Sequence, residues 1–176
     1  MAHERLTELL HAAPCVRIVT HEEAEAVDAA YRAALALNMD VKKWSSVVGV
    51  RAGTFSDEPL VPATSRAELA LCAWIGEVSS AYADARRVMY ITFDLTPHLN
   101  EPVPLRAWRE LVELLREKGG RLVMIDHAAD APPIVEATAA PFEIPLPDAA
   151  EIESIVMATL RNINRTRPLD LKMTRG

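Results

Sequence analysis

The sequence predicts an α/β protein, a three-layer α/β/α sandwich with about five parallel strands. Three apolar segments, residues 15–20, 88–94 and 121–126, are rich in β-branched and large aliphatic residues, which is typical of strands covered on both faces. Amphipathic helical patterns alternate with these strands. Because consecutive parallel strands need a crossover connection that is usually a helix, this alternation favours a parallel sheet between two helical layers.

The first half of the chain is predicted to hold an edge strand and two capped helices. A short N-terminal helix ends before Pro14, and residues 41–50 form one strand at or near the sheet edge, where polar residues are tolerated. The next helix begins at a Thr20–Glu23 capping box and the following one at a Ser65–Glu68 capping box. The second of these helices turns an apolar face to the core. The residues predicted on that face are Leu69, Cys72, Ile75, Ser79 and Tyr82.

The second half begins with a long amphipathic helix that ends at Gly119–Gly120. Trp108 and Leu111 lie on its apolar face and are predicted to be core residues. Residues 128–140 form a loop with at most one turn of helix, and residues 142–145 form a last short strand.

A final helix is predicted from Asp148, which caps its first turn. The residues predicted on its inward side are Ile152, Ile155, Val156 and Ile163. We therefore expect one domain over residues 1–164. Residues 165–176 form a polar C-terminal tail, which is a possible truncation before a lid or an ATPase domain.

Length and charge limit the classes of function. The chain has 176 residues, enough for one domain with a real core, and a formal net charge of −6 without a basic stripe, which excludes a nucleic-acid surface. No apolar run approaches the roughly 20 residues that cross a bilayer, so we expect a cytoplasmic protein with no membrane contact. Cys15 and Cys72 are predicted to be reduced core thiols, and no CxxC zinc framework is present.

The turn after the first strand is where a doubly wound fold binds a ligand, because helix amides and the topological switch point coincide there. A phosphate loop needs glycines that let the amides surround the anion and a lysine for the outer phosphates, but none of the six glycines precedes Gly49. Thr20 and Glu23 instead form the capping box, and Glu22 and Glu23 put negative charge at the helix start. The sequence therefore predicts a capped structural helix and no cofactor.

Five polar residues fall at or just past the carboxyl ends of predicted strands, so they could meet at one edge of the sheet. These residues are His21, Asp94, His98, Asp126 and His127. Asp94, Asp126 and His127 are candidate ligands of a divalent metal in a hydrolytic site. No local metal-ligand spacing supports this site, and aspartates at strand ends commonly cap loops, which favours no metal. The serines at 45–46 and 79–80 lack a glycine elbow, so no catalytic residue is predicted.

Three segments carry a resemblance to the AAA-type ATPases that spans nearly the whole chain. Residues 17–23 look like that family's first strand and an acidic helix start, and residues 93–99 are similar to its turn of aspartate, aromatic, histidine and proline. Residues 142–152 resemble the F-x-x-P-L-P-D-x-x-E-I element at the last strand and helix of AAA domains. The whole most resembles the degenerate N-terminal domain, which lacks a phosphate loop, of chloroplast and cyanobacterial ycf-type AAA proteins.

The resemblance implies the strand order last, first, fourth, third and second, as in P-loop NTPases. It places Asp94 where the magnesium-binding acid lies and Asp126 near the sensor position. The chain departs from the working ATPases in three places. Leu95 follows Asp94 where a second acid is usual, Thr96 stands where the family usually has histidine, and the chain ends at Gly176, where the helical lid would begin.

Two functions remain open. The favoured one is a non-catalytic AAA-like domain that is not an enzyme, does not bind ATP, and serves assembly or regulation of an AAA ATPase. The expected partner is an AAA ATPase module, in the same polypeptide or a separate protein, or another copy of the chain in a homo-oligomer. The alternative is a small metal-assisted hydrolase that uses Asp94 and Asp126.

Overall fold

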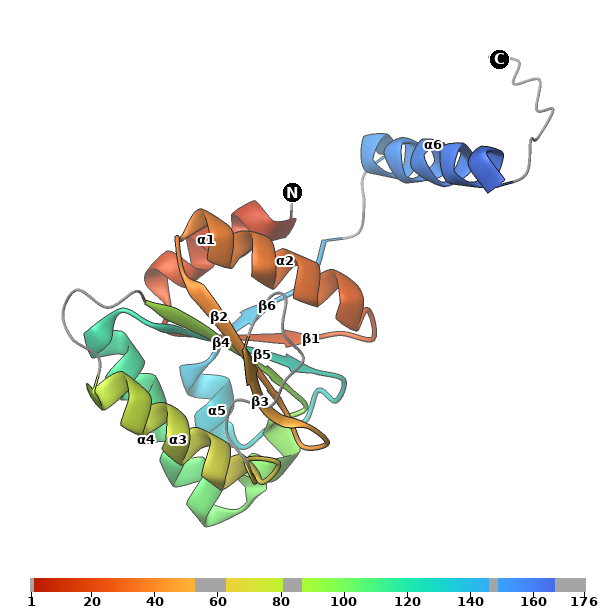
Figure 1. Cartoon of the computed structure of the whole chain (residues 1–176). Coiled ribbons are helices and arrows are strands. Elements are labelled where there is room, and N and C mark those ends of the chain that lie inside the picture. Colours follow the sequence, from red (N-terminus) through yellow and green to blue (C-terminus); the bar gives the residue numbers. More distant parts are fainter. Residues whose placement is uncertain (1, 53–62, 81–86, 146–148, 167–176) are drawn as a thin grey trace. The chain divides into compact units, whose positions relative to one another are not determined.

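The structure, a computed structural model, describes residues 2–52, 63–80, 87–145 and 149–166. The chain divides into two compact units, Met1–Ile144 and Pro145–Gly176. The first unit holds a six-stranded sheet in the order β3-β2-β4-β5-β1-β6 (Figure 1). The strands are β1 (Cys15–Val19), β2 (Asp40–Ser45), β3 (Gly49–Ala52), β4 (Val88–Phe93), β5 (Arg121–Asp126) and β6 (Ala140–Phe142). The run β6-β1-β5-β4-β2 is the order that the AAA resemblance implies.

The edge of the sheet differs from the prediction. Residues 41–50 were expected to form one strand, but they belong to two, because β2 and β3 form an antiparallel hairpin at the edge while every other neighbouring pair is parallel. Gly49 begins β3 with a φ of 79°, a left-handed conformation that favours glycine. The hydroxyl of Thr64 accepts a hydrogen bond from the Val50 N–H at 2.9 Å, so this segment covers part of the sheet edge.

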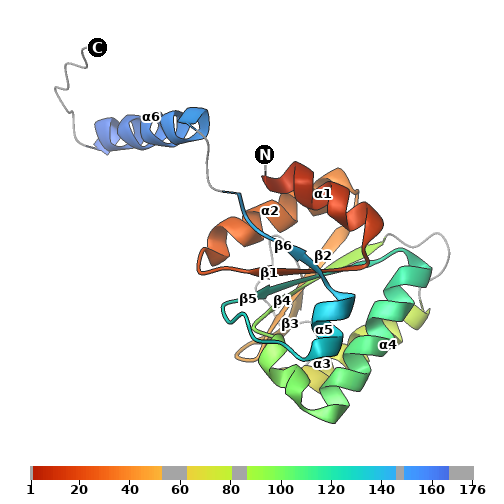
Figure 2. The same cartoon turned by 180° about the vertical axis from the view of Figure 1, so that it is seen from behind.

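Helices cover both faces of the sheet, which gives the predicted three layers (Figure 1, Figure 2). One face carries α1 and α2, and the other carries α3, α4 and α5. Their bounds are α1 (Ala2–Ala12), α2 (Glu23–Ala36), α3 (Ala67–Ser80), α4 (Pro102–Lys118) and α5 (Pro133–Thr138). A short 3-10 helix, η1 (Thr96–Asn100), leads from β4 to α4. Trp108 and Leu111 of α4 are fully buried, which confirms their assignment to the core.

α3 turns a different face to the core from the one predicted. Leu69 is 43% exposed, and Cys72 is a free exposed thiol, whereas Cys15 is buried as expected. The buried residues of the helix are Ala67, Ala70, Leu71, Trp74 and Val78. Apolar and small residues lie on all sides of this helix, so the periodicity of its sequence does not indicate which face packs against the core. Packing selects it, since the rings of Trp74 and Tyr90 lie 4.6 Å apart. The predicted Tyr82 lies outside the described residues.

Two element boundaries also differ near the ends of helices and strands. α3 begins at Ala67, inside the predicted Ser65–Glu68 capping box. The last strand is Ala140–Phe142 rather than residues 142–145, because its pairing with β1 runs from Val16 to Ile18 only. The one-turn helix expected in the loop before it is α5.

The second unit contains α6 (Ala149–Thr166), and it is described by itself. Ile152, Val156 and Ile163, which were predicted to face inward, are 50%, 46% and 39% exposed. The predicted cap Asp148 and the side chain of Ile155 lie outside the described part of the chain. The boundary between the two compact units falls after Ile144. No described helix is long and apolar enough to cross a membrane.

Candidate functional site

A buried polar network lies at the carboxyl ends of β1 and β5. Arg17 of β1 donates from Nε to Oδ2 of Asp126 at 2.8 Å, and the two side chains are only 10% and 1% exposed. Strand alternation puts both on the same face of the sheet, since Arg17 pairs with Met124 and Val19 with Asp126. A buried ion pair is stable only when further hydrogen bonds satisfy its remaining polar atoms.

Those further hydrogen bonds are present. The guanidinium of Arg17 donates from Nη1 to the carbonyl of Ala129 at 2.9 Å and from Nη2 to that of Ala128 at 2.7 Å. Thr96 of η1 donates to the carboxylate of Asp126 through its N–H at 3.2 Å and through its hydroxyl at 2.5 Å. The Arg17–Asp126 pair thus joins three segments: β1, η1 and the loop after β5.

Asp94 belongs to a second, more exposed pair. It follows β4 with a φ of 51°, a left-handed conformation that aspartate tolerates better than most residues. Its Oδ1 accepts from the N–H of His127 at 3.1 Å and lies 2.5 Å from Nδ1 of the same residue. The side chain of Asp94 is 47% exposed and that of His127 is 64% exposed, so the pair is accessible to solvent.

The start of α2 is built differently from the predicted capping box. The N–H of Thr20 donates to the carbonyl of Asp126 at 2.9 Å, so it is not available to the carboxylate of Glu23. The Thr20 hydroxyl accepts a hydrogen bond from the N–H of Glu22 at 2.9 Å. Glu22 precedes the helix, and its side chain makes no capping hydrogen bond. The predicted Thr20–Glu23 capping box is therefore wrong. Exposed Glu22, Glu23 and Glu25 surround the first turn.

The five strand-end residues do not meet in one cluster. Asp94 contacts His127, Asp126 contacts Arg17 and Thr96, and the ring of His98 lies against Trp44 with centroids 5.7 Å apart. His21 is exposed on the turn before α2. Across the described residues, no three side chains of His, Cys, Asp or Glu are grouped to hold a metal ion.

Sequence comparison assigns the chain to a family. Residues 2–144 match the model of the SpoVK-like AAA ATPase N-terminal domain. The chain belongs to this family. The matched residues coincide with the first compact unit, so the sheet, its five covering helices and the Arg17–Asp126 network are all parts of the SpoVK-like domain.

Structural comparison supports the AAA fold. The chain is similar to a chain of the HORMA:CdnC:Trip13 complex of E. coli MS115-1, with a TM-score of 0.61 and 12% identity, over 97% of this chain and 68% of that chain. At this identity the likeness concerns the fold alone. No curated protein matches the chain. The resemblance to AAA proteins, and to an N-terminal domain among them, is thus confirmed, while the finer likeness to the ycf-type proteins stays a resemblance.

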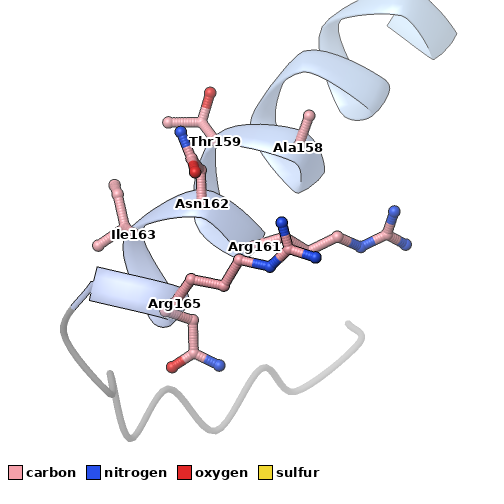
Figure 3. A pocket seen from close by; sticks show the side chains of 7 residues that line it. Ala158, Thr159, Arg161, Asn162, Ile163 and Arg165 are labelled. Carbon is pink, nitrogen blue, oxygen red and sulfur yellow. The ribbon is translucent and has the colours of Figure 1, made fainter.

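Two surface depressions of the described residues lie away from the buried network. One is in the SpoVK-like domain, beside the start of α2, and its charged lining residues are Glu23, Lys43, Arg51 and Asp94. Two acids and two bases give it no net charge, and Lys43 and Arg51 already have interaction partners. The other depression runs along the last turns of α6, from Ala158 to Arg165 (Figure 3). Because its walls come from one helix, it is no enclosed binding site.

Sequence reading missed the two residues that hold the site together. Arg17 was included only as part of the predicted strand over residues 15–20, and Thr96 only as a departure from the AAA pattern. A long cationic side chain inside a strand that is covered on both faces needs a buried acid, and Asp126 on a neighbouring strand was the candidate. That signal was available in the sequence, but the partner becomes definite only with the strand order.

Proposed function

We propose that this chain is a non-catalytic domain that serves the assembly or regulation of an AAA ATPase, in the same polypeptide or in a partner, and that it does not itself bind ATP with magnesium. The observation that carries the proposal is the turn between β1 and α2. In a P-loop fold this turn holds the phosphates, whereas here the amides of Thr20 and Glu22 are bound by the protein itself and three glutamates surround the helix start.

The geometry of the turn disfavours a triphosphate. The N–H groups of Thr20 and Glu22 are taken by Asp126 and by the Thr20 hydroxyl. The first turn of α2 has no side-chain cap, so some of its amides are available, but Glu22, Glu23 and Glu25 place three carboxylates around them. On a chain with a net charge of −6, this arrangement repels a polyanion.

The two aspartates that the AAA resemblance places at the magnesium-binding position and near the sensor position are engaged here in other contacts. Asp126, near the place of the sensor, is held by Arg17 and Thr96 in the interior. Asp94, at the place of the magnesium-binding acid, contacts His127 and is followed by Leu95, a buried apolar residue. We infer that the strand ends serve to fix the fold of the SpoVK-like domain rather than to hydrolyse a nucleotide.

The favoured partner is a protein. The family name attaches domains of this kind to an AAA ATPase, and the similar solved chain comes from a complex of several proteins. The exposed surface of the SpoVK-like domain around β1 and α2 would then be used for contacts with other protein parts rather than with a nucleotide.

The test is nucleotide binding to the full chain. A ligand at 100 times its dissociation constant stabilises a fold by about 2.7 kcal/mol, which raises the melting temperature by a few degrees for a domain of this size. We expect no shift with ATP, ADP or a non-hydrolysable analogue at millimolar concentration with magnesium. Calorimetry that gives a micromolar dissociation constant, abolished by Asp94→Ala, would instead return the domain to the working ATPases.

The regulatory part is tested separately. The ATPase rate of a SpoVK-like AAA module should change when this domain is present, either fused or added in excess, and a native mass measurement should detect the complex. A rate that is the same with and without the domain, together with separate masses, would contradict the role in regulation and assembly.

No observation favours the hydrolase alternative, because Asp94 and Asp126 bind different side chains and lie in different surroundings. A stoichiometric divalent metal in purified protein, lost on Asp94→Asn, would bring that function back.

A further inference from the structure

The edge strand β3 is covered by a short segment that precedes α3. We call residues 63–66 the edge strap. Ala63, Ser65 and Arg66 are exposed, whereas Thr64 is buried, with 4% of its surface accessible. Thr64 is therefore the residue that the edge strap turns inward against the sheet.

Thr64 binds two donors of the β2–β3 hairpin. Its hydroxyl accepts a hydrogen bond from the N–H of Val50 at 2.9 Å, and its carbonyl accepts one from Nε1 of Trp44 at 2.6 Å. Trp44 and Val50 pair across the two strands, and both are buried. Because β3 ends the sheet on this side, the Val50 N–H points away from β2, and Thr64 stands where a further strand would accept it.

The edge strap lies directly on the backbone of Gly49. A Cβ at this position would lie 2.8 Å from the hydroxyl oxygen of Thr64 and 3.2 Å from the backbone nitrogen of Ser65. The first of these distances is shorter than a real Cβ contact. The absence of a side chain at Gly49 therefore allows the strap to close on the hairpin.

The closed strap is strained at Ala63. This residue has a φ of 63°, a left-handed conformation that is unfavourable for a residue with a Cβ. Such strain persists only where the surrounding structure holds it in place. Here the hydrogen bonds of Thr64 hold it, so release of Thr64 would also relieve the strain at Ala63.

We propose that the edge strap is a strained latch, which opens while the rest of the SpoVK-like domain stays folded. A segment with one buried residue among four exposes little apolar surface when it opens, and such segments open at low free energy. An edge strand with free backbone groups is a template for a further strand, so the latch controls when the edge of β3 is available. The inference goes beyond the function proposed above, since it concerns the sheet edge and not the turn between β1 and α2.

Amide hydrogen exchange of the full chain, followed by NMR, tests whether the strap opens separately. The reporters are the Val50 amide and the Trp44 indole N–H, because Thr64 binds both in the closed state. After correction for intrinsic rates, we expect both to be at least about a hundredfold less protected than the amides of the interior strand β5. Low concentrations of urea should speed exchange in β5 and not at the two reporters, since local opening exposes little surface.

Substitution of Thr64 tests the hydroxyl. Thr64→Val keeps the shape of the side chain but leaves the buried Val50 N–H without its acceptor in the closed state. We expect the Val50 amide to exchange at least about tenfold faster, because water binds this N–H in the open state. The matched control is Thr64→Ser, which retains the hydroxyl and should change the rate less than about threefold.

Substitution of Ala63 tests the strain in the opposite direction. Ala63→Gly keeps the left-handed conformation without the Cβ, so the closed strap gains population and Val50 should exchange about threefold more slowly or less. Ala24→Gly, on the exposed side of α2, is the control for the added glycine and should leave the Val50 rate unchanged.

A substitution far from the strap separates local from global opening. Ala30→Leu overpacks α2 and should speed exchange in β5, but it should not change the two reporters, since α2 does not take part in the opening. Circular dichroism of each variant confirms that the chain remains folded.

Four outcomes overturn the proposal. One is a Val50 amide as protected as those of β5 in the unchanged chain. Another is an Ala30→Leu variant that speeds Val50 and β5 equally, which would mean that the strap opens only when the whole domain unfolds. The others are an unchanged Val50 rate in Thr64→Val and a faster one in Ala63→Gly.

Discussion

The two faces of the sheet are packed with different kinds of side chain. The face under α1 and α2 is mainly aliphatic, and the buried residues of α2 on it are all alanines. These are Ala26, Ala29, Ala30, Ala33 and Ala34, all buried. The face under α3 and α4 holds the large aromatic residues Trp44, Trp74, Tyr90 and Trp108. It also holds the Arg17–Asp126 pair, because strand alternation puts both residues on that side.

This difference separates two ways of stabilising a layer. Alanines let α2 approach the sheet closely, so that face depends on the exact volume of each side chain. On the opposite face, large rings fill the space and a buried ion pair lies beside them, so that face also depends on the hydrogen bonds of the Arg17–Asp126 pair. The Arg17–Asp126 network of the candidate site lies on this second face, together with the aromatic residues.

The largest expected effect is at the buried acid. Asp126→Ala should lower the free energy of unfolding by about 3–5 kcal/mol, because it leaves the Arg17 guanidinium buried without its carboxylate. Urea unfolding followed by circular dichroism measures this. Asp130→Ala, an exposed acid in the loop that Arg17 binds through backbone carbonyls, is the control and should change stability by less than about 0.5 kcal/mol. Equal effects at the two positions would mean that the loss at Asp126 does not come from the buried ion pair.

A smaller effect is expected on the alanine face. Ala30→Leu adds volume where α2 meets the sheet, and such overpacking should cost about 1–3 kcal/mol. Ala24→Leu, on the exposed side of the same helix, should be close to neutral. If Ala30→Leu is also neutral in thermal unfolding, the α2 face is not closely packed and the comparison fails there.

The aromatic face should also show itself at alkaline pH. Burial raises the pKa of the Tyr90 hydroxyl above its ordinary value of 10.0, and the nearby carboxylate of Glu77 raises it further. The folded state thus keeps the proton that the unfolded chain loses, so stability is full below pH 10 and falls as pH rises above it. The buried Cys15 thiol, whose pKa burial also raises, adds to the fall from about pH 9 upward.

Tyr90→Phe isolates the tyrosine contribution. Above pH 10, each pH unit costs the wild type up to about 1.4 kcal/mol per proton, and the variant should be spared that slope. Unfolding curves between pH 7 and pH 11 measure it, with the values at pH 7 as the internal reference. The same alkaline slope in both proteins would mean that Tyr90 ionises freely in the folded state.

How much of this was predictable from the sequence differs between the sheet and its surroundings. The three buried strands and their order followed from apolar runs and from the AAA resemblance, because the composition of a central strand leaves few alternatives. The hairpin of β2 and β3 was missed, since the only break within residues 41–50 is the short turn before Gly49. The buried face predicted for α3 was wrong because apolar residues lie on all sides of this helix.

The site was predictable in its parts and not in its pairing. Asp94 and Asp126 were found at the strand ends, where they lie, but their partners come from distant segments: His127 for one, and Arg17 with Thr96 for the other. The capping box failed for the same reason, since the N–H of Thr20 is bound by Asp126. A local sequence pattern does not show which group from a distant segment will form a hydrogen bond with a given backbone amide.

The smallest effect is expected at the exposed acid, and it separates charge from backbone conformation. Asp94→Asn should cost less than about 1 kcal/mol, because the pair with His127 is solvent-exposed and screened. Asparagine also tolerates the left-handed φ of 51° at this position, so the turn after β4 is kept.

Asp94→Ala should cost more than Asp94→Asn, by about 1–2 kcal/mol, since alanine pays the left-handed conformation without a polar side chain to bind the backbone locally. Both variants are measured by urea unfolding beside the wild type. An asparagine variant that loses 3 kcal/mol or more would show that the Asp94 charge is as deeply committed as that of Asp126. Asp94 would then belong with the buried network, and the contrast between a solvated pair and an interior one at neighbouring strand ends would no longer hold.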